Sequence, residues 1–187
     1  MALALRMLPE AKKFLSVVFP TIISLSEGLD ILQERFNFQT LTSLSSFGPL
    51  CDHWYTDAWM FFAPLPGLKK IYLDGPICAE VRDLFKALGE ESAPLGINRT
   101  LPFPSLSIIS IHCNHFDSDD AMSFAQFVTA LTAIVRRRRL SPCPISELHI
   151  GDSEIVEAAE VELLRKYNPG LTVVWDGENS TLSSMDT

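Results

Sequence analysis

Three stretches of the chain, LKKIYL (68–73), LSIISI (106–111) and ISELHI (145–150), share one spacing of apolar residues. Each follows the pattern L-x-x-L-x-L, with apolar anchors at the first, fourth and sixth positions. A fourth copy begins with Leu171 and Val174, and Asp176 stands where its third anchor is due. The pattern is the strand signature of a leucine-rich repeat, in which each copy contributes one strand and a returning helix. The spacing therefore predicts a stack of such units.

Proline or glycine precedes every one of these strands, in LPG (65–67), FPS (103–105), PCP (142–144) and NPG (168–170). Proline disfavours a helical conformation in the residue before it and cannot donate a helix hydrogen bond, so these segments end the preceding helix. Two weaker copies keep two apolar anchors and have serine at the third. One is anchored at Leu41 and Leu44, and the other at Ala11 and Phe14. The pattern predicts five repeats and leaves a sixth open.

Between the strands the apolar residues change to a helical period. Val81, Leu84, Phe85 and Leu88 fall at i, i+3, i+4 and i+7, which predicts an amphipathic helix. The same rule predicts a second helix from Phe124, Phe127, Val128, Leu131 and Val135, and a third over 153–167 with Ile155, Val156, Ala159, Val161 and Leu164 available for burial. Such units need stacked neighbours to cover their apolar faces.

Polar residues mark both ends of the second predicted helix. Residues 117–120 (DSDD) offer capping side chains and negative charge at its start. Arg136 to Arg139 place positive charge at its end, and we interpret this run as a solvated helix cap. The alternative functions for the run are a localisation signal or a small anion-binding patch.

Together these patterns predict an α/β fold: a leucine-rich-repeat solenoid of about five irregular repeats, with a curved parallel sheet and helices on its convex side. Residues 1–177 are expected to form a single domain, in which 1–40 make a poorly defined first repeat or cap. Residues 178–187 are short, polar and without periodicity, so we expect a disordered tail.

Composition limits the partners of this chain. Apolar residues make up 47% of it and charged residues 20%, and the net charge is −8. This balance argues against nucleic acid and anionic membranes, which bind clustered Lys and Arg. The apolar run 14–25 contains Pro20 and is too short to span a bilayer, so we expect buried repeat structure there. Four dispersed cysteines suit reduced thiols and a cytoplasmic or nuclear location.

His112, Cys113 and His115 offer metal-ligand types within four residues, and Cys143 and His149 of the next repeat supply two more. A structural zinc site needs four convergent ligands, however, and the chain has no CxxC pair. Asn114 occupies the turn position of the repeat, which explains the segment without a metal. No nucleophile elbow, phosphate loop or glycine-rich cofactor loop is present, so we expect no enzyme activity and no cofactor. A metal-binding protein or hydrolase that uses His112, Cys113, His115 and His149 is the alternative.

Aromatic residues gather in His53-Trp54-Tyr55, Trp59, Phe61 and Phe62. The cluster suits either a binding surface or a buried core. Because Trp59 and Phe62 lie three residues apart, as a helical stripe requires, core packing is the favoured interpretation.

Alternation along each strand sends the anchors inward and the intervening residues to the concave surface. Aromatic, imidazole, apolar and charged side chains mix there, as on a protein-binding face. The expected partner-binding residues are Lys70, Tyr72, Asp74, Ile108, Ser110, His112, Glu147, His149, Val173 and Trp175, with Gly151 and Gly177 at the remaining positions.

The segments LPGL (65–68), FPSL (103–106) and LTVVWDG (171–177) resemble the leucine-rich-repeat region of fungal F-box-like proteins over roughly residues 41–177. The resemblance implies a noncatalytic protein-interaction scaffold that recognises substrates for a cullin-type ubiquitin ligase. In that family an F-box holds a Skp-type adaptor and the repeats hold a target. Because no F-box segment is evident before the repeats, a Skp-type adaptor is expected only if an F-box is present elsewhere in a longer chain.

Overall fold

A computed structural model describes residues 2–5, 15–18, 33–34, 37–47, 56–74, 78–89, 101–112, 123–139, 142–151 and 156–179. Its main feature is a five-stranded sheet in the order β3-β4-β5-β6-β7, in which every neighbouring pair is parallel. The strands are β3 (Ser43–Phe47), β4 (Lys70–Asp74), β5 (Ile108–His112), β6 (Glu147–Gly151) and β7 (Thr172–Trp175). The predicted α/β class with a parallel sheet is therefore confirmed.

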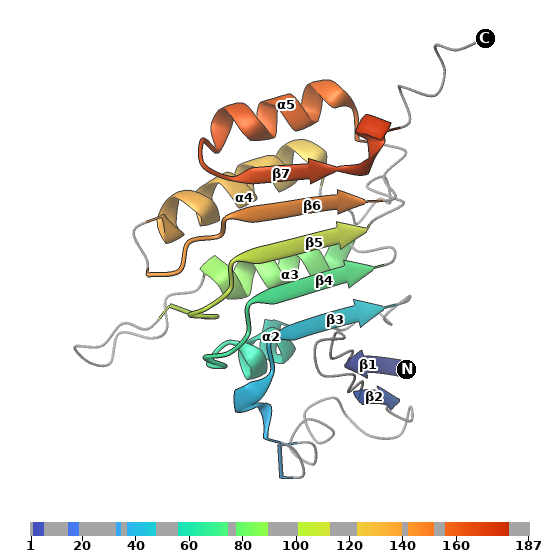
Figure 1. Ribbon diagram of the computed structural model, residues 1–187, viewed down its shortest axis with the longest axis vertical. Helices are drawn as coiled ribbons and strands as arrows, with labels where there is room; N and C mark the ends of the chain where they lie inside the picture. Colours follow the sequence, from blue (N-terminus) through green and yellow to red (C-terminus); the bar gives the residue numbers. More distant parts are fainter. Residues whose placement is uncertain are drawn as a thin grey trace.

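In the described residues, one α-helix lies in each connection between neighbouring strands of this sheet. These helices are α2 (Thr56–Phe62), α3 (Cys78–Gly89), α4 (Phe124–Arg138) and α5 (Ala158–Tyr167). Figure 1 shows α3 and α4 behind the sheet and α5 beside β7, so the near face of the sheet carries none of the described helices. Sequence-ordered parallel strands with their helices on one side leave the opposite face free of the described helices.

The buried face of the sheet consists of two rows of residues in register. One row is Leu44, Ile71, Ile109, Leu148 and Val173, and the other includes Leu73, Ile111, Ile150 and Trp175. All of them are buried except Trp175, which is partly buried against the same core. The anchors predicted for β4, β5 and β6 are confirmed as core residues.

The chain enters the strands through a repeated backbone arrangement. The Thr42 carbonyl accepts from the amides of Lys69 and Lys70 at 2.9 and 3.2 Å. The Lys69 carbonyl accepts in the same way from Ser107 and Ile108, at 3.0 and 3.1 Å. The Ser107 carbonyl repeats the arrangement with Ser146 and Glu147, at 2.9 and 3.1 Å. Each unit therefore ties the start of its strand to the unit before it.

The predicted helical stripes are confirmed for α3 and α4. Val81, Leu84, Phe85 and Leu88 of α3 are all buried. In α4, Phe127 and Leu131 are buried as predicted, and Phe124, Val128 and Val135 are partly buried against the same core. Ile134, which the predicted stripe omits, is buried as well. The N-terminal cap of α4 is Ser123, whose hydroxyl accepts from the Gln126 amide while the Gln126 side chain accepts from the Ser123 amide. The cap expected at 117–120 lies outside the described residues.

Helix α5 is shorter than the sequence predicts. It begins at Ala158, after Glu157, which shares a reciprocal capping box with Glu160. Val156, Val161 and Leu164 are buried as expected, but Ala159 is exposed, so its predicted burial is wrong. Ile155 lies outside the described residues.

The last strand adopts the opposite phase from the one that its sequence spacing predicts. Val173 is in register with Leu148 and is buried, whereas Val174 is 48% exposed. The entry to β7 is one residue shorter than the entries to the other strands, so the second anchor falls at Val173. The predicted anchor at Val174 is wrong for this reason.

The N-terminal segments do not add a sixth parallel strand. β1 (Ala2–Leu5) and β2 (Leu15–Val18) pair antiparallel with each other in a separate two-stranded sheet. Ala11 and Phe14, the two anchors of the weak repeat predicted there, lie outside the described residues, and Ser16 at its third position lies in β2. A short 3-10 helix, η1 (Phe38–Thr40), leads into β3, and the Asn37 side chain caps it by accepting from the Gln39 amide at 3.0 Å.

The aromatic residues of α2 belong to the core, as expected. Trp59 and Phe62 are fully buried. Phe38 and Phe61 meet edge to face with centroids 5.9 Å apart, and Phe61 meets Phe62 in the same way at 5.1 Å. His53, Trp54 and Tyr55 lie outside the described residues.

The basic run at the end of α4 has a structural role that the sequence does not reveal. Arg138 is fully buried, and its guanidinium donates to the carbonyls of Pro102 and Phe103 at 2.6 and 2.5 Å. Arg137 donates to the carbonyl of Gly89 at the end of α3. The interpretation of the whole run as a solvated cap is wrong for Arg138, because this side chain fastens α4 to the loop that precedes β5.

A second 3-10 helix, η2 (Asp176–Asn179), follows β7 directly. The expected disordered tail therefore begins too early, since 178 and 179 belong to this helix. Residues 180–187 lie outside the described part of the chain.

Candidate functional site

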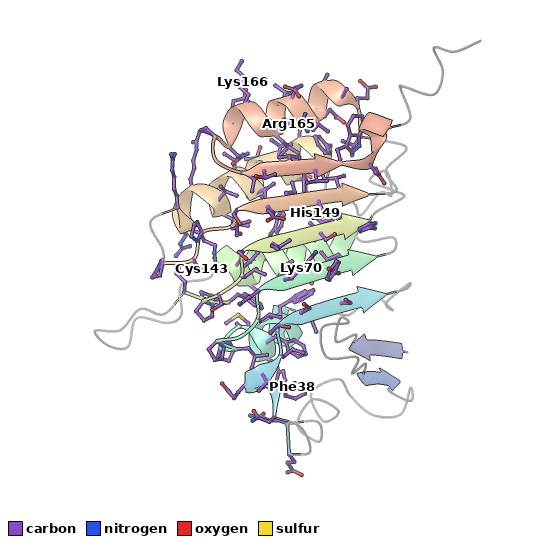
Figure 2. All side chains as sticks on the ribbon, in the orientation of Figure 1. Phe38, Lys70, Cys143, His149, Arg165 and Lys166 are labelled. Atoms are coloured by element: carbon purple, nitrogen blue, oxygen red, sulfur yellow. The ribbon has the colours of Figure 1, made fainter. Side chains whose placement is uncertain are left out.

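The open face of the sheet is the candidate functional site. We define it by two rows of residues in register across the five strands. The first row is Ser43, Lys70, Ile108, Glu147 and Thr172, and the second is Ser45, Tyr72, Ser110, His149 and Val174. Figure 2 labels Lys70 on β4 and His149 on β6, with β5 between them. Alternation along the strands turns these side chains away from the buried rows.

Two pairs of side chains run along β4 and β6. The Lys70 ammonium lies 4.3 Å from the centroid of the Tyr72 ring, a cation–π arrangement. On β6, His149 Nε2 lies 3.0 Å from a carboxylate oxygen of Glu147, and their side chains are 31% and 42% exposed. A cation with its aromatic partner therefore flanks β5 on one side, and an anion with its imidazole partner flanks it on the other.

The centre of the open face lies on β5 and consists of the apolar Ile108 and the small Ser110. Ile108 is half-buried, whereas Ser110 is only 1% exposed, so the prediction that Ser110 lies at the surface is wrong. Its small side chain lies between the larger Tyr72 and His149 of the neighbouring strands in register. Larger neighbours on both sides explain the burial of this serine. Ser45 of the same row is buried as well, so this row is accessible at Tyr72, His149 and Val174.

Ser110 and His112 form a hydrogen-bonded pair, with Oγ and Nε2 3.2 Å apart. A serine next to a histidine is the beginning of a nucleophile–base pair. A nucleophile must reach the substrate, however, and the near-complete burial of Ser110 closes it to a substrate carbonyl. The geometry therefore favours a bond that fixes the imidazole.

The His112 ring also depends on the glycine beside it in β6. His112 and Gly151 are in register, and a Cβ added to Gly151 would lie 2.5 Å from His112 Nδ1 and Cε1. The imidazole therefore lies directly over the bare backbone of Gly151. Any larger residue there forces the ring to move.

We expect Gly151→Ala to displace the His112 ring and break its bond to Ser110, at a cost of about 1 kcal/mol in the free energy of unfolding. The cost is modest because a side chain moves while the backbone stays in place. Imidazole NMR signals of His112 should shift strongly, and urea unfolding should give the stability change. Gly89→Ala is the control, since a Cβ there meets nothing within 4 Å. Unchanged His112 signals in Gly151→Ala would contradict the stacking of the ring on Gly151.

Two predicted binding residues on β7 lie on the wrong face. Val173 and Trp175 are in register with the core residues Leu148 and Ile150, and the Trp175 ring packs so closely on Gly177 that a Cβ there would clash with it. Thr172 and Val174 occupy the open face in their place and were missed. The sequence gives no signal for this shift, because NPG (168–170) is followed directly by Leu171 just as LPG (65–67) is followed by Leu68.

The other predicted residues fall as follows. Lys70, Tyr72, Ile108, Glu147 and His149 lie on the open face and are partly accessible. His112 follows them at the end of β5, and the backbone of Asp74 is in register with it. The Asp74 side chain lies outside what the structure describes.

The proposed metal ligands do not converge where they are described. His112 ends β5 and Cys143 precedes β6, so these two residues lie toward opposite ends of neighbouring parallel strands. The Cys143 thiol donates to the Ser105 carbonyl at 3.2 Å, and His149 faces Glu147. Across the described ranges, no group of three or more His, Cys, Asp or Glu residues is placed to hold a metal ion. Cys113 and His115 lie outside those ranges.

No protein-family model, no curated protein and no solved structure matches this chain. Within the part of the chain that the structure describes, no helix has both the length and the apolar character needed to cross a membrane.

Proposed function

We propose that this chain is a noncatalytic protein-interaction scaffold that binds its partner on the open face of the sheet. The observation that carries the proposal is the placement of Lys70, Tyr72, Ile108, Glu147 and His149 in two registered rows on the side without described helices. Rigid strands hold these side chains, so a partner would meet a preformed surface.

The chemistry of this face suits a protein partner. It combines an aromatic ring, an exposed valine, two opposite charges and an imidazole within a few strand spacings. Protein interfaces pair aromatic anchors with a polar rim, and charges at the rim select the partner. A single-sign basic surface, as nucleic acid would require, is not what these two rows present.

The fold supports a more specific form of the proposal. Repeated strand entries and sequence-ordered parallel strands are what a leucine-rich-repeat solenoid requires. With the resemblance to F-box-like repeat proteins, the proposal is that the bound protein is a target delivered to a cullin-type ubiquitin ligase. In this role the open face holds the target and takes no part in chemistry.

Quantitative capture of cellular proteins tests the proposal. The bait is the immobilised chain, compared with the double variant Tyr72→Ala/His149→Ala and with the control Arg136→Ala/Lys166→Ala on exposed helix positions. We expect one set of captured proteins to fall about tenfold or more with the open-face variant and to persist with the control, because central aromatic anchors dominate binding energy. Thermal unfolding checks that both variants remain folded.

An identical set captured by all three baits would contradict the open face as the binding surface. For the ubiquitin-ligase role, the captured protein should accumulate in cells in which the open-face variant replaces the natural chain. If its abundance is unchanged, the face binds a partner but the role in degradation is wrong.

A further inference from the structure

The side chains in the first row of the open face are complementary to the same row taken in reverse order. From β3 to β7 it contains Ser43, Lys70, Ile108, Glu147 and Thr172. In the reverse order a small hydroxyl meets a small hydroxyl, a cation meets an anion and isoleucine meets isoleucine. A surface with this property is complementary to a second copy of itself turned over.

The positions of Lys70 and Glu147 allow both charge pairs to form in one symmetric arrangement. Parallel strands lie about 4.8 Å apart, so Lys70 on β4 and Glu147 on β6 lie at equal distances on either side of β5. A two-fold axis that runs along β5, between two facing sheets, exchanges the two sides. Each Lys70 then lies opposite Glu147 of the other copy, and Ile108 lies opposite Ile108.

We propose that the open face binds a second copy of this chain in a symmetric, face-to-face dimer. This inference rests on the proposed function, because it names the occupant of the same surface. Two Lys70–Glu147 pairs flank an Ile108–Ile108 contact on the axis. In the second row, Tyr72 lies opposite His149 of the second copy on each side of the axis, and the buried Ser110 lies between these two larger residues in each copy.

The size of the face sets the strength of the dimer. Five strands of about five residues span roughly 24 by 16 Å. A stable interface buries roughly 800 Å² on each partner, so this footprint belongs to a weak, transient association. The dimer therefore forms at high concentration, and a partner that binds the same face more tightly displaces the second copy.

Charge reversal tests the pairing. Sedimentation velocity from about 10 μM to 1 mM measures the dissociation constant for the unaltered chain, Lys70→Glu, Glu147→Lys and the double variant. Each single reversal places like charges together twice per dimer, so we expect dissociation constants at least tenfold higher. The double variant restores opposite charges and should dimerise like the unaltered chain. Lys166→Glu on α5 is the control and should change nothing.

An equimolar mixture of Lys70→Glu and Glu147→Lys gives the sharpest result. One copy then carries two acidic side chains at these positions and the other carries two basic ones, so we expect a heterodimer where neither variant alone dimerises. A monomeric unaltered chain at 1 mM, or a dimer that persists in both single variants, would overturn the inference. If the dimer is absent but other proteins are captured through Tyr72 and His149, the proposed function stands and the dimer is wrong. If the dimer forms but no other protein is captured, the dimer stands and the proposed binding of other proteins is wrong.

Discussion

Replacement of Arg138 by alanine should lower the free energy of unfolding by about 3 kcal/mol, because a buried carbonyl left without its donor costs about 1–3 kcal/mol and the cavity adds to this cost. The guanidinium is fully buried and donates to two carbonyls of the loop before β5. Its removal leaves the Pro102 carbonyl without this donor and opens a cavity where the side chain packed. Urea unfolding followed by tryptophan fluorescence measures the loss.

The loop that Arg138 holds has an unusual backbone. Phe103 adopts a φ of 54°, in the left-handed region that favours glycine. Its amide donates to the Ala63 carbonyl at 2.6 Å, and its carbonyl accepts from both Leu106 and Arg138. Burial lowers the pKa of the Arg138 guanidinium, and the nearby Cys143 acts in the opposite direction. The hydrogen bonds that Arg138 donates offset part of the cost of burying its charge and hold the strained backbone of Phe103 in place.

The neighbouring arginine provides the control. Arg139 is exposed at the C-terminal cap of α4, so Arg139→Ala should change the stability by less than about 0.5 kcal/mol. Equal, small effects of Arg138→Ala and Arg139→Ala would mean that the run is the solvated cap that its sequence indicates.

The replacement Trp59→Ala should destabilise the fold by about 3–5 kcal/mol, because it deletes the largest fully buried side chain. Trp59 lies on α2, which closes the connection between β3 and β4. Thermal or chemical unfolding monitored by far-ultraviolet circular dichroism measures the change, since the variant loses one of the three tryptophans on which fluorescence depends.

Tyr72→Ala is the matched control for Trp59, since it truncates an aromatic residue on the open face. It should cost less than about 1 kcal/mol. If Trp59→Ala proves as mild as Tyr72→Ala, the aromatic residues of α2 do not form the core, and the alternative of an aromatic binding surface regains support.

Much of the sheet follows from local spacing. The anchors of β4, β5 and β6 were predictable because three copies repeat the same alternation and the same proline-containing entry. The helical stripes of α3 and α4 were predictable for a similar reason. Both patterns report burial on one side of an element, which is a local property that the sequence expresses directly.

The misplaced residues depend on contacts between units. One residue fewer at the entry to β7 reverses the phase of Val173 and Val174, and only pairing with β6 reveals it. The burial of Arg138 likewise depends on a loop 35 residues earlier in the chain. Neither contact leaves a periodic trace in the sequence.

The sequence predicts part of the candidate site, because alternation within a strand is local, whereas contacts between strands are not. Alternation places Lys70, Tyr72, Ile108, Glu147 and His149 correctly on the open face. It does not reveal that Ser110 is covered, that His112 rests on Gly151, or that Lys70 and Glu147 are symmetric about β5. These properties arise only when neighbouring strands are set in register.

The most direct test of the sheet with its two registered rows is to measure which residues of β7 contact which residues of β6. In NOESY spectra of isotopically labelled protein, we expect cross-peaks between the methyl groups of Leu148 and Val173, and between the His149 ring and the methyl groups of Val174. Methyl contacts between Leu148 and Val174, with Val173 lacking core contacts, would contradict the registered rows on which the proposed binding face depends.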